Sequence, residues 1–206
     1  MSTLPNDLAA GQRGPADHTI REQIVSAAND HFAKYGYGKT TVSDLAREIG
    51  FSKAYIYKFF DSKQAIGEAI CNQCLDKVLV SVTAAMEGAK SPTDKLRRMF
   101  RAIVAASAEL FFSDRKLYDI AAYSVTEKWS SSSLYGDRIY TMLEQIVVEG
   151  RQAGEFERKT PLDETCRAIT SAMQPFTNPV MLQYSLDGLP DASNEVIGLV
   201  LRSLAP

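Results

Sequence analysis

Four side chains between positions 53 and 58 could bind a polyanion: Lys53, Tyr55, Tyr57 and Lys58. Lysine ammonium groups pair with phosphates, and tyrosine hydroxyls and rings can contact phosphates and base edges. From position 34 to 63 the chain holds six basic and three acidic residues, a charge of +3, so the rest of the −2 chain sums to −5. A basic segment attached to an acidic body is typical of a module that faces nucleic-acid phosphates.

The pattern around these side chains predicts two short helices joined by a turn, at Thr40–Phe60. Thr41 followed by Asp44 has the spacing of a capping box, which opens the first helix, and Gly50 ends that helix. Ala46 is small enough to let two helices touch, and Gly50 tolerates the unusual backbone angles of a turn. The apolar residues that can anchor the second helix are Leu45, Ile49, Ile56 and Phe60. This arrangement predicts a helix-turn-helix that docks in a DNA major groove.

Two surface helices with solvated lysines and tyrosines would also give a helix–glycine–helix pattern, which is a weak signal by itself. Here the small residue, the glycine, the caps and the basic, aromatic face coincide. Their coincidence favours DNA binding over simple solvation of the face.

Several short motifs in this region occur in the order and spacing of a known family. The segment from about Ile20 to Ile70 resembles the N-terminal domain of TetR-family transcriptional regulators. The motifs are FAKYGY (32–37), TT (40–41), DLA (44–46), GFSK (50–53) and IYKFFDSK (56–63). The resemblance implies an all-α fold of about nine helices, with a three-helix DNA-binding domain followed by a helical effector-binding and dimerisation domain.

The resemblance also implies roles by position. Thr40 or Thr41, Tyr57 and Lys63 would contact phosphates, and the residues from Ser52 to Tyr55 would lie at the major-groove end of the recognition helix. The expected DNA-binding residues are Thr40, Thr41, Ser52, Lys53, Ala54, Tyr55, Tyr57, Lys58 and Lys63. The family often has glycine at Ala54 and histidine at Phe59. These departures imply the loss of one phosphate donor and a slightly different placement of the backbone of the recognition helix.

The organisation along the chain is predicted as three parts: a disordered tail at 1–17, the DNA-binding domain at 18–63 and the second domain at 64–206. Ser130–Ser133 is predicted as a loop, because serine is a weak helix former. Pro175 and Pro179 are expected to interrupt the region after Met173.

The second domain shows no catalytic constellation, cofactor motif or metal-ligand spacing, and both histidines, His18 and His31, precede it. We therefore expect no enzyme, no cofactor and no metal. Its aromatic and methionine side chains are typical of core, but as a group they could line an apolar effector pocket of the kind that TetR relatives have. The expected lining residues are Met86, Phe100, Phe112, Tyr123, Trp129, Met142 and Met173. Candidate acids for a cationic ligand are Glu109, Asp119 and Glu127.

Two of the three cysteines, Cys71 and Cys74, are three residues apart and share a helix face. Buried small side chains are the expected identity, since the usual metal patterns need a second pair. Two alternative functions remain: a thiol-sensing DNA-binding regulator, and a helical enzyme or binding module whose helix-turn-helix is incidental.

Three further expectations concern assembly and place. The segments 162–173 and 194–204 carry small and large apolar residues, and in TetR relatives the last two helices pair with those of a second subunit. The resemblance therefore implies a homodimer on a palindromic operator, and favours a repressor released by a small hydrophobic or aromatic effector. No apolar run is long enough to cross a membrane and the N-terminus has no signal-peptide core, so we expect a cytoplasmic protein.

Overall fold

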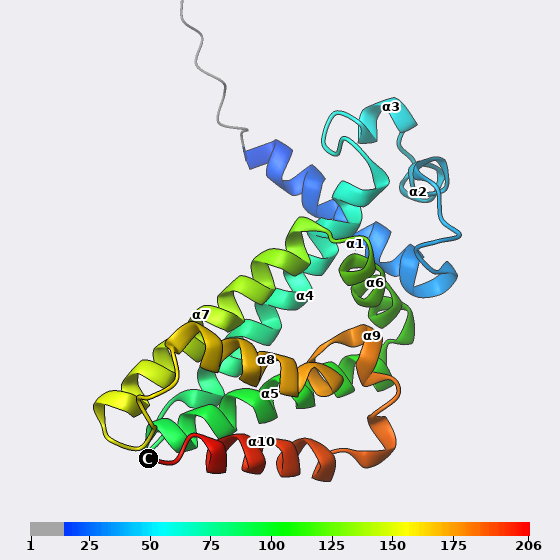
Figure 1. The fold of residues 1–206 in the computed structure, drawn as a ribbon. Coiled ribbons are helices and arrows are strands. Elements are labelled where there is room, and N and C mark those ends of the chain that lie inside the picture. Colours follow the sequence, from blue (N-terminus) through cyan, green and yellow to red (C-terminus); the bar gives the residue numbers. More distant parts are fainter. Residues whose placement is uncertain (1–14) are drawn as a thin grey trace, which may run out of the picture.

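The computed structural model describes residues 15–206, and the fold of that part is all-helical, as predicted (Figure 1). It contains ten α-helices and one short 3-10 helix. In chain order they are α1 (Pro15–Tyr35), α2 (Val42–Ile49), α3 (Lys53–Ile56), α4 (Lys63–Met86), α5 (Pro92–Ser113), α6 (Arg115–Thr126), α7 (Ser130–Gln152), α8 (Leu162–Thr177), α9 (Pro179–Leu182), the 3-10 turn (Leu186–Gly188) and α10 (Asp191–Ser203).

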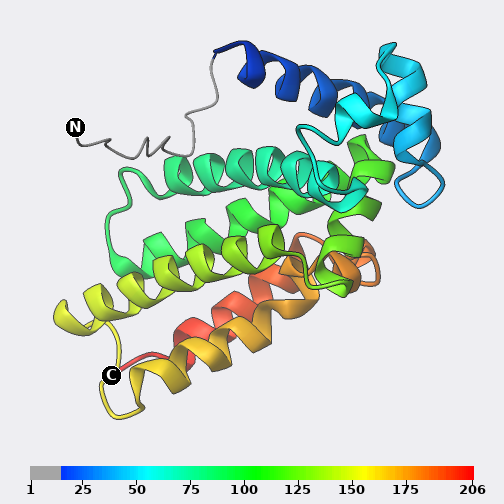
Figure 2. The same ribbon diagram turned by 90° about the horizontal axis from the view of Figure 1, so that it is seen from above.

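Helices α1 to α3 gather at one end of the molecule, and α8 and α10 lie side by side near the other (Figure 1). Figure 2 shows that α8 and α10 form the side of the body that faces away from α4. The long helix α4 leads from the small N-terminal unit into the body, where it packs against α5 and α7. Helix α4 therefore supplies buried residues to both the N-terminal unit and the body.

The chain buries its apolar residues in two clusters. One fills the body between α4, α5, α7, α8 and α10, and includes Phe100, Leu143 and Met173. The other lies under α1 to α3, and it extends into α4 and α6 through Ile70 and Ile120. The predicted division between residues 63 and 64 thus crosses a continuous core, because α4 supplies one wall of it.

Local predictions failed at two places and were confirmed at a third. The expected interruption after Met173 is present: α8 ends at Thr177, and the short helix α9 begins at Pro179. Pro175 lies in the last turn of α8, where the carbonyl that it cannot bond belongs to exposed Ser171. Ser130–Ser133 starts α7 instead of forming a loop, since tertiary contacts such as the 2.6 Å hydrogen bond between the Ser124 and Ser132 hydroxyls outweigh the low helix propensity of serine. Helix α1 already begins at Pro15, inside the predicted tail, and residues 1–14 lie outside the described residues.

None of the helices in the described part of the chain is both long and apolar enough to span a membrane.

Candidate nucleic-acid interface

Helix α2 is capped at both ends by the residues that flank it. The Thr41 hydroxyl accepts a hydrogen bond from the Asp44 amide at 3.2 Å, and the Asp44 carboxylate accepts bonds from the Thr41 amide at 3.0 Å and hydroxyl at 2.7 Å. At the other end Gly50 adopts φ 78°, in the left-handed region that favours glycine. The predicted capping box and turn are confirmed, and they fix where α2 begins and where it ends.

The recognition helix α3 is short, and the turns after it continue its direction. Ser52 caps it by accepting a hydrogen bond from the Tyr55 amide at 3.1 Å. Ile56 and Phe60 are buried and anchor it to the core, as predicted. The amides of Phe59 and Phe60 both bond to the Ile56 carbonyl, so the chain stays coiled to Phe60. We call Ser52–Phe60 the recognition segment.

The outer face of the recognition segment carries its polar and cationic side chains. Lys53, Tyr57 and Lys58 are exposed, as are Ser52 and Ala54. The Lys53 ammonium lies 5.8 Å from the centre of the Tyr57 ring. A row of free donors above a buried apolar anchor is an arrangement that can enter a groove and bind phosphates.

Unlike the exposed Lys53 and Tyr57, Tyr55 is half-buried. It stacks edge-on between Phe51 at 5.1 Å and Phe59 at 5.3 Å, measured between ring centres. The Lys58 ammonium lies 5.6 Å from the Tyr55 ring. Phe59, which stands where the family often has histidine, therefore packs within an aromatic row.

The two threonines before α2 have different environments. Thr40 is only 2% exposed, and its hydroxyl donates to the Gly36 carbonyl at 2.9 Å. Thr41 is exposed. The expectation that either could contact phosphate is thereby narrowed to Thr41, since a buried and bonded hydroxyl cannot reach the DNA backbone.

Lys63, at the first position of α4, points toward the loop before α2. Its ammonium donates to the carbonyls of Tyr37 and Thr40, both at 3.1 Å, and lies 4.2 Å from the centre of the Tyr37 ring. Burial lowers the pKa of this ammonium below its ordinary value of 10.5. No pattern in the sequence indicates these partners, because the loop and α4 are more than twenty residues apart.

Comparisons with known proteins agree with this geometry. The sequence model of the family "Bacterial regulatory proteins, tetR family" matches residues 24–70. The sequence model of the family "Tetracyclin repressor-like, C-terminal domain" matches residues 92–197, and this second match alone covers about half of the chain. The chain belongs to the TetR family.

Curated relatives match over a minor part of the chain. The transcriptional regulator HbdR of Aromatoleum sp. (strain CIB) is 34% identical over 76 residues, which is 37% of this chain and 33% of HbdR. The negative regulator IcaR of the biofilm operon icaADBC of Staphylococcus aureus (strain Newman) is 35% identical over 57 residues, 28% of this chain and 31% of IcaR. The chain thus matches about a third of the length of these relatives.

Solved TetR-like structures share the fold over nearly the whole chain. FadR of Bacillus subtilis, solved in complex with stearoyl-CoA, gives a TM-score of 0.66 at 19% identity, covering 89% of this chain and 98% of FadR. The TetR-family regulator PfmR of Thermus thermophilus gives 0.57 at 25% identity, covering 89% of this chain and 99% of PfmR.

The expected effector-lining residues of this TetR-family chain do not share one cavity. Phe100, Trp129 and Met173 are buried, and Met86 and Met142 are half-buried against the body core. Phe112 is 73% exposed and Tyr123 is 44% exposed. Trp129 belongs to the core under α1 to α3, where its ring lies 5.3 Å from Tyr37. The seven residues therefore fall into two cores and the surface.

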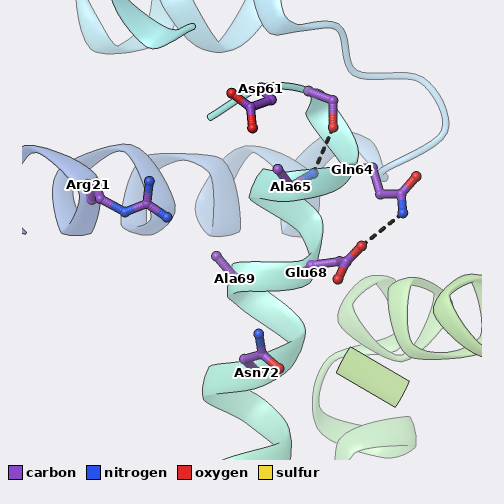
Figure 3. Close-up of a pocket in the computed structure, with 8 residues that line it drawn as sticks. Arg21, Asp61, Gln64, Ala65, Glu68, Ala69 and Asn72 are labelled. Atoms are coloured by element: carbon purple, nitrogen blue, oxygen red, sulfur yellow. Dashed lines mark hydrogen bonds between the residues drawn. The ribbon is translucent and has the colours of Figure 1, made fainter. Parts of the chain in front are cut away.

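A surface hollow of about 350 Å³ lies between α1 and α4 (Figure 3). Arg21 projects from α1 toward it, and Gln64, Glu68 and Asn72 follow one another along α4. Gln64 donates to Glu68 at 2.8 Å, so these polar groups bind each other. The hollow is open and polar, which does not fit a largely hydrophobic effector.

The thiols and acids give no sign of redox or metal chemistry in the described part of the chain. Burial raises the pKa of Cys71 to about 12, and burial also raises that of Cys74. Residues 15–206 contain no group of three or more His, Cys, Asp or Glu side chains that could hold a metal ion. Glu109, Asp119 and Glu127 are exposed, and Asp119 pairs with Arg115 at 3.2 Å.

Proposed function

We propose that this TetR-family regulator binds an approximately palindromic operator as a homodimer and represses transcription until a small, largely hydrophobic or aromatic effector releases it. The observation that carries the proposal is the recognition segment, which exposes Lys53, Tyr57 and Lys58 while Ile56 and Phe60 anchor it in the core. The proposal assigns the protein no catalytic activity. Because bacterial DNA lies in the cytoplasm, it also places the protein there.

The proposed DNA contacts are of two kinds, contacts to phosphates and contacts to base edges. Thr41, Tyr57 and Lys58 would bind phosphates and set the register. Ser52, Lys53, Ala54 and Tyr55 would approach base edges in the major groove. The half-buried Tyr55 has its ring fixed between Phe51 and Phe59, so it would present only its hydroxyl end.

The proposed dimer interface is the outer face of α8 and α10. Ile169, Ile197 and Val200 are buried within the chain, whereas Ala168, Ala172 and Leu199 are exposed on the same two helices. Small residues on α8 let a second copy approach closely, and Leu199, which is 60% exposed, supplies apolar area. Two-fold pairing would place the recognition segments ~34–36 Å apart, one turn of DNA.

In this structure Phe100 and Met173 are buried in the core of the body. The proposed effector therefore binds a second conformation of the body, in which the core is open to a ligand. A ligand shifts the equilibrium only by its difference in affinity for the two states, so a few kcal/mol of preference are required. The stearoyl-CoA in the FadR structure makes long-chain acyl thioesters one reasonable class to include in a ligand screen.

Selection of DNA from a random-sequence duplex library tests the proposal. Wild-type protein is expected to enrich an inverted repeat whose half-sites lie about one helical turn apart. A reporter gene placed behind the enriched duplex should be expressed less when the protein is present. Enrichment of no duplex over the starting library would overturn the DNA-binding assignment, and higher reporter expression would overturn repression.

A further inference from the structure

Four cations of the N-terminal unit, on or beside the recognition segment, differ in what their side chains contact. Lys53 and Lys58 are exposed on the recognition segment, and their ammonium groups lie over the rings of Tyr57 and Tyr55. Lys63 and Arg21 instead bind backbone carbonyls of other segments of the chain. The two groups are therefore expected to have different roles.

Lys63 joins the start of α4 to the loop before α2. Two of the three N–H groups of its ammonium are taken by the carbonyls of Tyr37 and Thr40, and the Tyr37 ring covers it at 4.2 Å. Thr40 directly precedes Thr41, the N-cap of α2. The contact thus fixes where α2 begins relative to α4, and the recognition segment is the stretch of chain held between those two helices.

The position of Tyr37, which Lys63 binds, is itself fixed, because the Tyr37 ring is buried among other aromatic rings. Its ring centre lies 5.1 Å from Phe32 and 5.3 Å from Trp129, and burial raises its pKa to about 12. The loop that Lys63 binds is therefore tied into the core under α1 to α3. Release of Lys63 toward a phosphate would break two charge-assisted hydrogen bonds and one cation–ring contact at once.

Arg21 makes a corresponding contact at the end of the recognition segment. Its guanidinium, on α1, donates to the Phe59 carbonyl and lies 4.2 Å from the centre of the Phe60 ring. Since Phe60 is the last residue of the recognition segment, Arg21 fixes that end against α1. Arg21 thus ties the end of the recognition segment to α1, and Lys63 ties the loop before α2 to the start of α4.

We infer that Lys63 and Arg21 are positioning residues, which hold the recognition segment in register with α1, α2 and α4, and that Lys63 does not serve as a phosphate contact. The inference rests on the proposed DNA binding and replaces, for Lys63, the role implied by family resemblance. A phosphate contact and a positioning contact differ in one measurable respect. The logarithm of the association constant falls linearly with the logarithm of the salt concentration, and each lost phosphate contact makes that slope shallower by about 0.9. Loss of a positioning contact instead lowers the affinity by the same factor at every salt concentration and leaves the slope unchanged.

The experiment compares Lys63→Met, Lys63→Arg and, as a matched control, Lys58→Met. The probe is the duplex enriched by wild-type protein, titrated at several salt concentrations. Lys63→Met is expected to raise the dissociation constant about tenfold with an unchanged slope. Lys58→Met should lower the slope by about 1.8 for the two subunits of a dimer. Lys63→Arg should restore affinity, because a guanidinium can also donate to two carbonyls.

A second measurement needs no DNA. Amide hydrogen exchange of residues 40–45 should be faster in Lys63→Met than in wild type, and that of residues 59–62 faster in Arg21→Met, while the helices of the body keep their protection. Exchange that is unchanged in Lys63→Met, together with a slope lowered by about 1.8, would overturn the inference and return Lys63 to the phosphate contacts. Affinity and exchange both equal to wild type would overturn it as well. A wild-type protein that enriches no duplex contradicts the proposed function, whereas the exchange result bears on the positioning contacts alone.

Discussion

The indole ring of Trp129 closes over Gly67 of α4 so tightly that a methyl group at Gly67 would lie 2.7 Å from its Cη2 atom. Trp129 is the only tryptophan of the chain and is 2% exposed. Its ring also meets Tyr37, which Lys63 binds. The missing side chain at Gly67 therefore lets α4, the start of α7 and the loop before α2 meet at one point.

Gly67→Ala is expected to destabilise the fold by about 1–3 kcal/mol, because the added methyl group must displace a buried ring. Gly136→Ala is the matched control: it lies in helix α7 with no heavy atom within 4 Å of the new methyl group, so it should stabilise by up to about 1 kcal/mol. Denaturant unfolding at a fixed protein concentration measures both. A Gly67→Ala protein as stable as wild type would show that Trp129 can move aside without cost.

The capping box of α2 predicts a dependence of stability on pH. Hydrogen bonds from the Thr41 hydroxyl and amide hold the pKa of Asp44 below its ordinary value of 3.8. A carboxyl with a lowered pKa stabilises the folded state above its unfolded pKa, and this contribution is lost as the pH falls through the folded pKa. Asp44→Asn should therefore be less stable than wild type at pH 7, and the difference should vanish in acid. A difference that persists unchanged below pH 3 would contradict the prediction.

The thiols are expected to be unreactive in the folded protein. Burial raises the pKa of Cys71 to about 12, so almost all of this group is the unreactive thiol at pH 7. Labelling of native protein by an aromatic disulfide reagent should be at least ~100-fold slower than labelling of unfolded protein, and peroxide should leave DNA affinity unchanged. Loss of DNA binding on oxidation in wild type, but not in a Cys71→Ser, Cys74→Ser variant, would revive the thiol-sensing alternative.

Tyr57→Phe removes one exposed hydroxyl and leaves the ring in place. If that hydroxyl binds a phosphate, the dissociation constant should rise about 3- to 10-fold, and equally for all DNA sequences, because phosphate contacts carry no sequence information. Fluorescence anisotropy with the enriched duplex and with single-base variants of it measures the effect. An effect confined to particular bases would instead identify Tyr57 as a base contact.

Leu199→Glu places a carboxylate on the outer face of α10. In a two-fold interface the charge would be buried in both subunits, so the dimer dissociation constant should rise by more than ~100-fold. Val80→Glu is the control, since Val80 is 69% exposed and belongs to α4, a helix on the side of the body away from α8 and α10 (Figure 2). Analytical ultracentrifugation at several protein concentrations measures the dimer dissociation constant of both variants. A Leu199→Glu protein that remains dimeric would place the interface elsewhere.

The sequence by itself determined the helix-turn-helix, because every signal for it is local. A capping box spans four residues, a left-handed glycine acts at its own position, and Ile56 and Phe60 share a helix face by spacing alone. The family resemblance rests on the same short stretch. These features survive in the structure because local geometry and the core under α1 to α3 favour the same conformation.

Only the tertiary structure decided which side chains are free to act. Thr40 and Thr41 are adjacent and chemically alike, yet one is buried against Gly36 and the other is exposed. Lys58 and Lys63 are both lysines of one motif, yet Lys63 binds carbonyls more than twenty residues away. The same holds for Trp129, which joins the core under α1 to α3 only because Gly67 leaves room for it. Contacts between distant segments depend on how helices pack, and no local pattern of residues encodes that packing.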